Sequence, residues 1–156
     1  KVCISWRGGV AVTRRSRRSL DLMQLLPVLS VPGVHWINLQ YGERAREISE
    51  FTAAQGISIA DWPEAIDGDY DNTAALVSAL DLVISVCTSL VHLTGALGRP
   101  AWVMTPRIPE WRYGLEHDTM PWYPSVRLFR QPERGEWQPV IAKIGDGLRA
   151  KVTGQN

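Results

Sequence analysis

The sequence has few of the features that mark membrane, secreted or metal-binding proteins. No apolar run approaches the roughly 20 residues that a membrane-spanning helix needs, and no signal-peptide pattern is present. There are only two cysteines, Cys3 and Cys87, which lie far apart and lack a metal-ligand spacing such as C-x-x-C. We therefore expect reduced thiols in a cytoplasmic protein, without a membrane span or a metal site.

Several common signatures of nucleotide-binding and hydrolytic sites are missing as well. The sequence contains no G-x-G-x-x-G, no G-x-x-x-x-G-K-[ST] and no G-x-S-x-G pattern. These absences disfavour a dinucleotide oxidoreductase, a P-loop NTPase and an α/β-hydrolase. A net charge of +1 over 156 residues also argues against a general nucleic-acid-binding surface. Phosphate-containing ligands other than those of these protein classes therefore remain as candidates.

Short apolar runs alternate with stretches of helical periodicity, which predicts one α/β domain over residues 1–156. Expected strands cover 2–6, 34–39, 57–59, 82–86, 101–104 and 126–129. Expected helices cover 20–29, 43–55, 71–80 with Asp71 as N-cap, 88–97 with Gly98 at the end, and 140–148. The strands are of the buried type, so we expect a Rossmann-like three-layer α/β/α fold with a mainly parallel sheet of about six strands. The segment 105–124 is expected to be mostly loop.

The loops at the carboxyl ends of such strands are where an open parallel sheet binds its ligand. After the fourth expected strand, Thr88 and Ser89 stand at a helix start, where backbone amides and hydroxyls can bind phosphate. After the first strand come Arg7 and Gly8, followed by the basic run Arg14–Arg18. We expect a diphosphate to be held between the amides and these guanidinium groups.

Each of these features has a simpler structural interpretation. Thr88 or Ser89 could serve only as a helix cap, and the basic run could be a solvated surface loop. His92 lies one helical turn beyond Thr88 and would face the same pocket, although a packed structural histidine is the alternative. Cys87 has no base partner in the sequence, so we do not expect it to be a nucleophile.

Asp81–Leu93 together with Gly95–Pro100 resembles the strand, D-T-x-x-x-H-L turn and helix of the C-terminal lobe of heptosyltransferase-like enzymes, especially bacterial ones attached to tetratricopeptide repeats. Supporting stretches are 17–20, 39–43, 111–113 and 121–124. The resemblance covers nearly the whole chain. It departs at one position, because Cys87 stands where the family usually has Asp before Thr, and a charged or hydrogen-bonding group is lost there.

The resemblance implies one lobe of a GT-B fold and a metal-independent, inverting glycosyltransferase with a nucleotide sugar as substrate and no cofactor. It also implies that Thr88 and Ser89 bind the donor diphosphate with Arg18, while the ribose and base face Gln40, Glu43 and the backbone at Gly68, Asp69 and Tyr70. The chain, which opens at Lys1 directly before an apolar run, is then expected to be a fragment of a longer protein. An N-terminal lobe and tetratricopeptide repeats would be its partners, and it would be inactive alone.

Two other functions fit the sequence. A degenerate, non-catalytic nucleotide-binding or scaffold module would explain Cys87. A nucleotide-sugar epimerase shares the two-lobed architecture but isomerises its substrate without an acceptor. The identity of the donor base, the sugar, the acceptor and the general base does not follow from the residues.

Overall fold

The computed structural model describes residues 1–9, 15–66 and 69–154, and within them seven strands form one sheet in the order β3-β2-β1-β4-β5-β7-β6. Strands β1 to β5 and β7 are parallel neighbours, whereas β6 pairs antiparallel with β7. The strands are β1 (Val2–Ser5), β2 (Trp36–Asn38), β3 (Ile59–Ala60), β4 (Leu82–Val86), β5 (Ala101–Thr105), β6 (Thr119–Met120) and β7 (Tyr123–Arg130).

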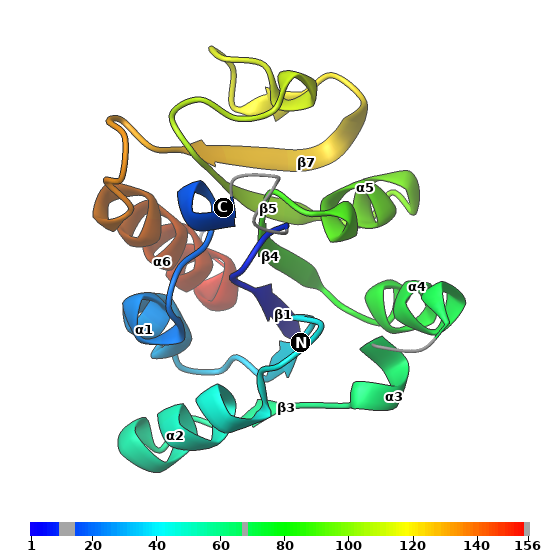
Figure 1. Ribbon diagram of the computed structural model, residues 1–156, viewed down its shortest axis with the longest axis vertical. Coiled ribbons are helices and arrows are strands. Elements are labelled where there is room, and N and C mark those ends of the chain that lie inside the picture. Colours follow the sequence, from blue (N-terminus) through cyan, green and yellow to red (C-terminus); the bar gives the residue numbers. More distant parts are fainter. Residues whose placement is uncertain (10–14, 67–68, 155–156) are drawn as a thin grey trace.

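Helices cover both faces of the sheet (Figure 1). One side carries α1, α2 and α6, and the other carries α4 and α5. The α-helices are α1 (Leu26–Leu29), α2 (Ala45–Gln55), α3 (Pro63–Ile66), α4 (Tyr70–Ser78), α5 (Ser89–Ala96) and α6 (Gln138–Thr153), and the 3₁₀ helices are η2 (Arg15–Arg17), η3 (Leu22–Leu25) and η4 (Trp111–Tyr113). None of the helices in the described residues combines the length and the apolar character needed to span a membrane.

Two hydrophobic cores lie between these layers because successive side chains of a strand point to opposite faces. In β4, Leu82, Ile84 and Val86 pack in the core that also contains side chains of α1, α2 and α6. Val83 points the other way, into the core shared with α4 and α5. All five residues of β4 are buried, so the prediction of a buried central strand at 82–86 is confirmed, as is the Rossmann-like three-layer architecture.

Three expectations about the elements before the fourth strand are wrong in detail. The helix expected at 20–29 is split into η3 and α1, because Pro27 has no N–H for an unbroken helix through this segment. The segment 61–70, where neither a helix nor a strand was expected, contains α3. The N-cap of α4 is Asp69 and not Asp71, since the Asp69 carboxylate accepts a hydrogen bond from Asp71 N at 3.0 Å.

The second half of the chain also differs from expectation at three places. The strand expected at 126–129 is longer and forms β7 over Tyr123–Arg130. The sheet has seven strands instead of about six, because the two-residue β6 folds back onto β7 within the segment expected to be mostly loop. The same segment contains η4. The closing helix α6 is longer than 140–148 and runs to Thr153, where Gly154 ends it with a left-handed φ of 70°.

Candidate functional site

The direction of the chain through the sheet reverses between β1 and β4, which is the position where open α/β sheets bind ligands. From β1 the chain proceeds outward to β2 and β3, and from β4 it proceeds the other way to β5 and β7. A pocket of about 580 Å³ lies at the carboxyl ends of these strands. It is lined by Gly9, Arg18, Tyr41, Cys87, Thr88, Ser89, His92, Glu110, Arg112 and Tyr113. We call it the switch-point cleft.

Helix α5 begins in the switch-point cleft without a side-chain cap. Thr88 occupies the N-cap position in an extended conformation, but its side chain makes no capping hydrogen bond to the helix. Its hydroxyl lies 3.2 Å from Ser85 Oγ instead. Thr88 is thus the N-cap by position, as the simpler interpretation has it, but its side chain does not cap the helix. The first amides of α5 keep the donor capacity that anions bind at a helix start.

Arg18 enters the same cleft from the loop that follows β1. Its guanidinium donates to Cys87 O at 3.3 Å and forms an ion pair with Glu110. The Arg18 side chain is only 13% exposed and that of Glu110 is 33% exposed, so water screens the pair weakly. Glu110 Oε2 is buried and has no hydrogen-bond partner among the described residues. An anionic ligand would thus compete with Glu110 for Arg18.

His92 brings a neutral imidazole to the wall of the cleft. Its ring is half-buried, with its centroid 5.9 Å from that of Tyr113 and 5.8 Å from that of Tyr123. Burial lowers the pKa of His92 below its usual value of 6.5; the charge of Arg112 lowers it further, and that of Glu110 opposes the shift. His92 is therefore uncharged at neutral pH.

Cys87 lines the switch-point cleft, and Gly8 packs closely against its backbone. Both cysteines of the chain are buried free thiols, and burial raises the pKa of Cys87 far above its usual range, so its thiol stays protonated. A Cβ at Gly8 would lie 2.9 Å from Cys87 O, closer than real contacts allow. Gly8 thus permits the loop after β1 to approach β4, and its amide donates to Ser19 Oγ at 3.2 Å.

A second pocket of about 520 Å³ adjoins the switch-point cleft and shares Tyr41 and Ser89 with it. Its other walls include Leu39, Leu90 and Tyr70, whose hydroxyl donates to Ser89 O at 3.4 Å. Tyr41 and Tyr70 are about half exposed. Their rings, with the apolar walls, suit the stacking of a flat aromatic group. We call this pocket the aromatic pocket.

Arg18, Thr88, Ser89 and His92, all predicted from the sequence, meet in the switch-point cleft, and the predicted Tyr70 lies in the adjoining aromatic pocket. Neither pocket is lined by Arg7, Gly8, Gln40, Glu43 or Asp69. The roles assigned to all of these residues stay predictions. Of the other positions named above, Arg14 and Gly68 lie outside the described residues.

The side chains that line neither pocket are engaged in holding the loops around them. Arg7 forms an ion pair with Glu47 and donates to Glu43 O at 3.1 Å. Gln40 is buried, and its Oε1 accepts from Ser5 Oγ, Trp6 N and Arg7 N at 3.2, 3.1 and 2.7 Å. Asp69 caps α4. These contacts fix where the loops after β1 and β2 leave the sheet.

Glu110 and Arg112 are cleft residues that were not predicted from the sequence as ligands. They follow β5, whereas the sequence directed attention to the loops after the first four strands. Because β5 lies next to β4 in the sheet, its loop reaches the same crevice. The signal available in the sequence was that the charged residues Glu110 and Arg112 follow soon after the apolar strand β5.

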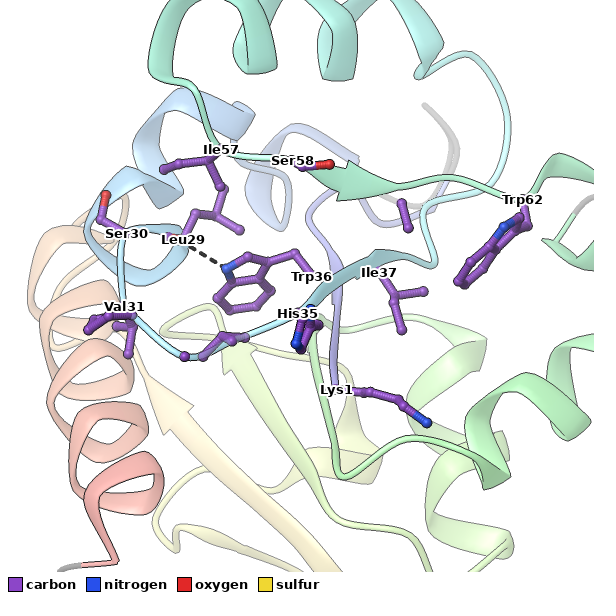
Figure 2. Close-up of a pocket in the computed structure, with 14 residues that line it drawn as sticks. Lys1, Leu29, Ser30, Val31, His35, Trp36, Ile37, Ile57, Ser58 and Trp62 are labelled. Atoms are coloured by element: carbon purple, nitrogen blue, oxygen red, sulfur yellow. Dashed lines mark hydrogen bonds between the residues drawn. The ribbon is translucent and has the colours of Figure 1, made fainter.

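A third pocket, of about 670 Å³, opens at the opposite edge of the sheet (Figure 2). Its lining includes Lys1, His35 and Ser58, which precede β1, β2 and β3. Trp36 projects into this region, and its indole donates to Leu29 O at 2.9 Å. Few polar groups converge here, so it is a weaker candidate than the switch-point cleft. Within the described residues, no group of three or more His, Cys, Asp or Glu side chains could hold a metal ion.

Comparison with known proteins shows the fold but no family. No family model matches the chain. Protein FlbA of Caulobacter vibrioides is 38% identical over 152 residues, which are 96% of this chain and 25% of that protein. The chain therefore spans about a quarter of the length of this curated relative.

Solved structures of two E. coli heptosyltransferases share the fold. ADP-heptose lps heptosyltransferase II has a TM-score of 0.66 at 14% identity, with 99% of this chain and 46% of that one covered. Heptosyltransferase WaaC with ADP-2-deoxy-2-fluoro heptose has a TM-score of 0.62 at 14% identity, with 99% and 43% covered. The chain thus has the fold of slightly less than half of each enzyme, in agreement with the expected single lobe of a GT-B fold.

Proposed function

We propose that this chain is the donor-binding lobe of a metal-independent, inverting glycosyltransferase. The observation that carries the proposal is the convergence of Arg18, Thr88, Ser89 and His92 around the uncapped start of α5, at the switch point of the sheet. The likeness of the fold to half of each heptosyltransferase adds support. A nucleotide sugar is the ligand class that suits a phosphate site beside an aromatic pocket.

In the proposed complex the diphosphate lies at the start of α5 and the base lies in the aromatic pocket. The amides of Ser89 and Leu90 and the positive end of the helix dipole bind the phosphate oxygens. Arg18 approaches from the loop after β1, and Arg112 from the loop after β5. Tyr41, which borders both pockets, lies between the phosphate and base positions.

The proposed reaction is a single displacement at the anomeric carbon of the donor. The acceptor oxygen forms a bond to that carbon while the bond between the carbon and the diphosphate oxygen breaks, and the electron pair leaves with the diphosphate. Charge therefore grows on the leaving group, where Arg18 and the α5 amides stabilise it. The acceptor proton passes to a general base. We assign both this base and the acceptor site to the partner lobe. In this proposal the whole protein also carries tetratricopeptide repeats and is located in the cytoplasm.

Calorimetric titration of this chain with ADP, UDP, GDP and CDP tests the proposal. ADP comes first, because one of the heptosyltransferase structures holds an ADP-sugar analogue and another, which has a TM-score of 0.56, holds ADP. We expect saturable binding with one nucleotide preferred. Absence of binding by all four nucleotides would contradict a donor site on this lobe.

Replacing Ser89 with proline tests the role of the α5 amides. Ser89 is the first residue of α5, where proline is tolerated, and the extended Thr88 suits the position before a proline. The variant removes one N–H donor while keeping the helix. We expect about tenfold weaker binding of the preferred nucleotide in calorimetry, the effect of one hydrogen bond to a charged group.

Ser89→Ala is the matched control, because it removes the hydroxyl and keeps the amide. Its affinity should stay within about threefold of that of the unmodified chain. The rotatable hydroxyl contributes less to phosphate binding than the fixed backbone amide does. Equal losses in both variants would refute the assignment of the amide as a phosphate ligand.

Binding should also depend on the protonation of His92. His92 is neutral at pH 7.5 because its pKa lies below 6.5, and a bound diphosphate raises that pKa by favouring the charged form. Affinity should therefore increase as the pH falls from 7.5 to 5.5, by up to about tenfold for a pKa rise of about one unit. The ligand for calorimetry is a nucleotide sugar, whose diphosphate diester does not titrate in this range. His92→Gln should abolish the increase, and an unchanged pH profile in that variant would contradict this role.

A non-catalytic nucleotide-binding module is the second candidate, and the ion pair between Arg18 and Glu110 favours it. A carboxylate already holds the cation that would stabilise the leaving group, and the thiol of Cys87 is buried and protonated. Such a module would bind a nucleotide, while the full-length protein would transfer no sugar from any donor it binds.

A further inference from the structure

A smaller pocket on the same edge of the sheet gathers three arginines outside the switch-point cleft. It has a volume of about 170 Å³ and is lined by Arg17, Arg107 and Arg134, together with Gln131 and Trp137. Arg107 follows β5, Gln131 follows β7, and Arg17 ends η2. The two pockets share no lining residue. We call this one the arginine pocket.

The adjacent residues Arg17 and Arg18 serve different pockets. Arg18 lines the switch-point cleft and Arg17 lines the arginine pocket, so the basic segment lies between the two. Arg107 and Arg134 are both exposed, and neither forms an ion pair with a carboxylate among the described residues. No carboxylate among the described residues therefore neutralises the charge of Arg107 or Arg134.

Gln131 points independently to a missing acceptor at this place. It is only 3% exposed, and its Oε1 accepts from Arg107 N at 3.2 Å and from Gly135 N at 3.4 Å. These two donors fix the orientation of the amide, because the opposite orientation would place N–H groups against N–H groups. Nε2 is left buried with no partner among the described residues. A buried donor of this kind calls for an acceptor that the protein does not supply.

The residue that precedes helix α6, Trp137, lines the same pocket. This N-cap residue makes no side-chain capping hydrogen bond. Over sixteen residues the peptide dipoles sum to a partial positive charge at this end. A nearby helix start, the guanidinium groups of Arg107 and Arg134, and an unsatisfied amide donor all favour an oxyanion.

We propose that the arginine pocket binds one phosphate group. Its volume of about 170 Å³ is below the roughly 300 Å³ at which pockets for drug-sized ligands begin, so it suits a phosphate rather than a whole nucleotide. The phosphate is either the free ion or a monoester group carried by a larger molecule bound along this edge. This inference does not depend on the proposed glycosyl transfer, because it uses none of the residues of the donor site.

Titration of the isotopically labelled chain with inorganic phosphate, followed by NMR, tests the proposal. Chloride is exchanged for phosphate at constant ionic strength. We expect saturable shifts of the Gly135 amide, the Gln131 side-chain amide and the Trp137 indole. Arg107→Gln and Arg134→Gln should each weaken this binding about tenfold, as expected for one charge-assisted hydrogen bond. Both side chains are exposed, so the fold should persist.

Two control variants separate this site from general charge effects and from the donor site. Arg46→Gln removes one exposed positive charge on α2 and should leave the affinity unchanged. Arg18→Gln weakens anion binding in the switch-point cleft. It should also leave the shifts at Gly135 and Trp137 unchanged. Loss of binding in Arg46→Gln as large as in Arg134→Gln, or no saturable shift at these three groups, would overturn the proposal.

The source of the phosphate is read from a parallel titration with phenyl phosphate. Binding at least as tight as that of inorganic phosphate would assign the pocket to a phosphate monoester on a larger molecule. Binding of inorganic phosphate alone would assign it to the free ion. Both outcomes retain the site, and absence of both would refute it.

Discussion

Replacing Arg18 with glutamine should weaken nucleoside diphosphate binding between about tenfold and about 100-fold. A hydrogen bond to a charged group contributes about 1.5–3 kcal/mol, and each 1.4 kcal/mol corresponds to a factor of ten in affinity. The side chain is only 13% exposed, so solvent screens its charge weakly. Loss of Arg18 also leaves the Glu110 carboxylate uncompensated in the cleft, where it repels the diphosphate. Calorimetry with the preferred nucleotide measures the effect.

Glu110→Gln is the matched partner of this experiment, and the account predicts the opposite sign for it. Removing the carboxylate frees Arg18 from its ion pair and should strengthen binding by several-fold. The double variant should bind more tightly than Arg18→Gln alone, because the repulsion is gone. Unchanged affinity in Arg18→Gln, or weaker binding in Glu110→Gln, would contradict the assignment of Arg18 as the diphosphate ligand and Glu110 as its competitor.

Gly95→Ala should destabilise the chain strongly. A Cβ at this position of α5 would lie 2.3 Å from Tyr123 Cγ and 2.7 Å from Tyr123 Cβ. These atoms sit close to the backbone of β7, so they cannot move aside as the end of a flexible side chain would. We expect the free energy of unfolding to fall by about 3 kcal/mol or more, at the upper end of overpacking effects. Denaturant unfolding of the chain measures the change.

Gly145→Ala provides the control in another helix. A Cβ there would meet the flexible end of Arg149 at 3.4 Å and Pro27 O at 3.5 Å, which are ordinary contacts. The change should stabilise the chain by up to about 1 kcal/mol, because alanine favours the helix over glycine. Similar effects of the two variants would contradict the close packing of α5 against Tyr123. Since Gly95 seats α5 on β7, surviving Gly95→Ala protein should also bind nucleotide more weakly.

The sequence was sufficient for the fold and for the part of the site that follows directly from topology. The apolar run at 82–86 identified a buried parallel strand, because only a strand covered on both faces is apolar throughout. Parallel strands bring their carboxyl ends to one edge, and this rule brought the basic run that contains Arg18 together with Thr88 and Ser89. No long-range contact had to be known for these assignments.

The remaining site residues depended on contacts that a sequence does not reveal. Arg7 belongs to the same basic region as Arg18, yet its partner is Glu47, forty positions away. Gln40 follows a strand as a ligand residue would, but its side chain accepts three hydrogen bonds from the end of β1 and the loop after it. Glu110 enters the cleft only because β5 lies beside β4. Side-chain pairing across the sheet edge decided these positions, and local patterns carry little information about it.

NMR mapping of the preferred nucleoside diphosphate on this chain tests the central claim most directly. The account predicts saturable shifts of the Gly9, Ser89 and Leu90 amides around the switch-point cleft, with the dissociation constant found by calorimetry. Shifts confined to Trp36 and Ile57, which line the pocket at the opposite edge of the sheet, would contradict it.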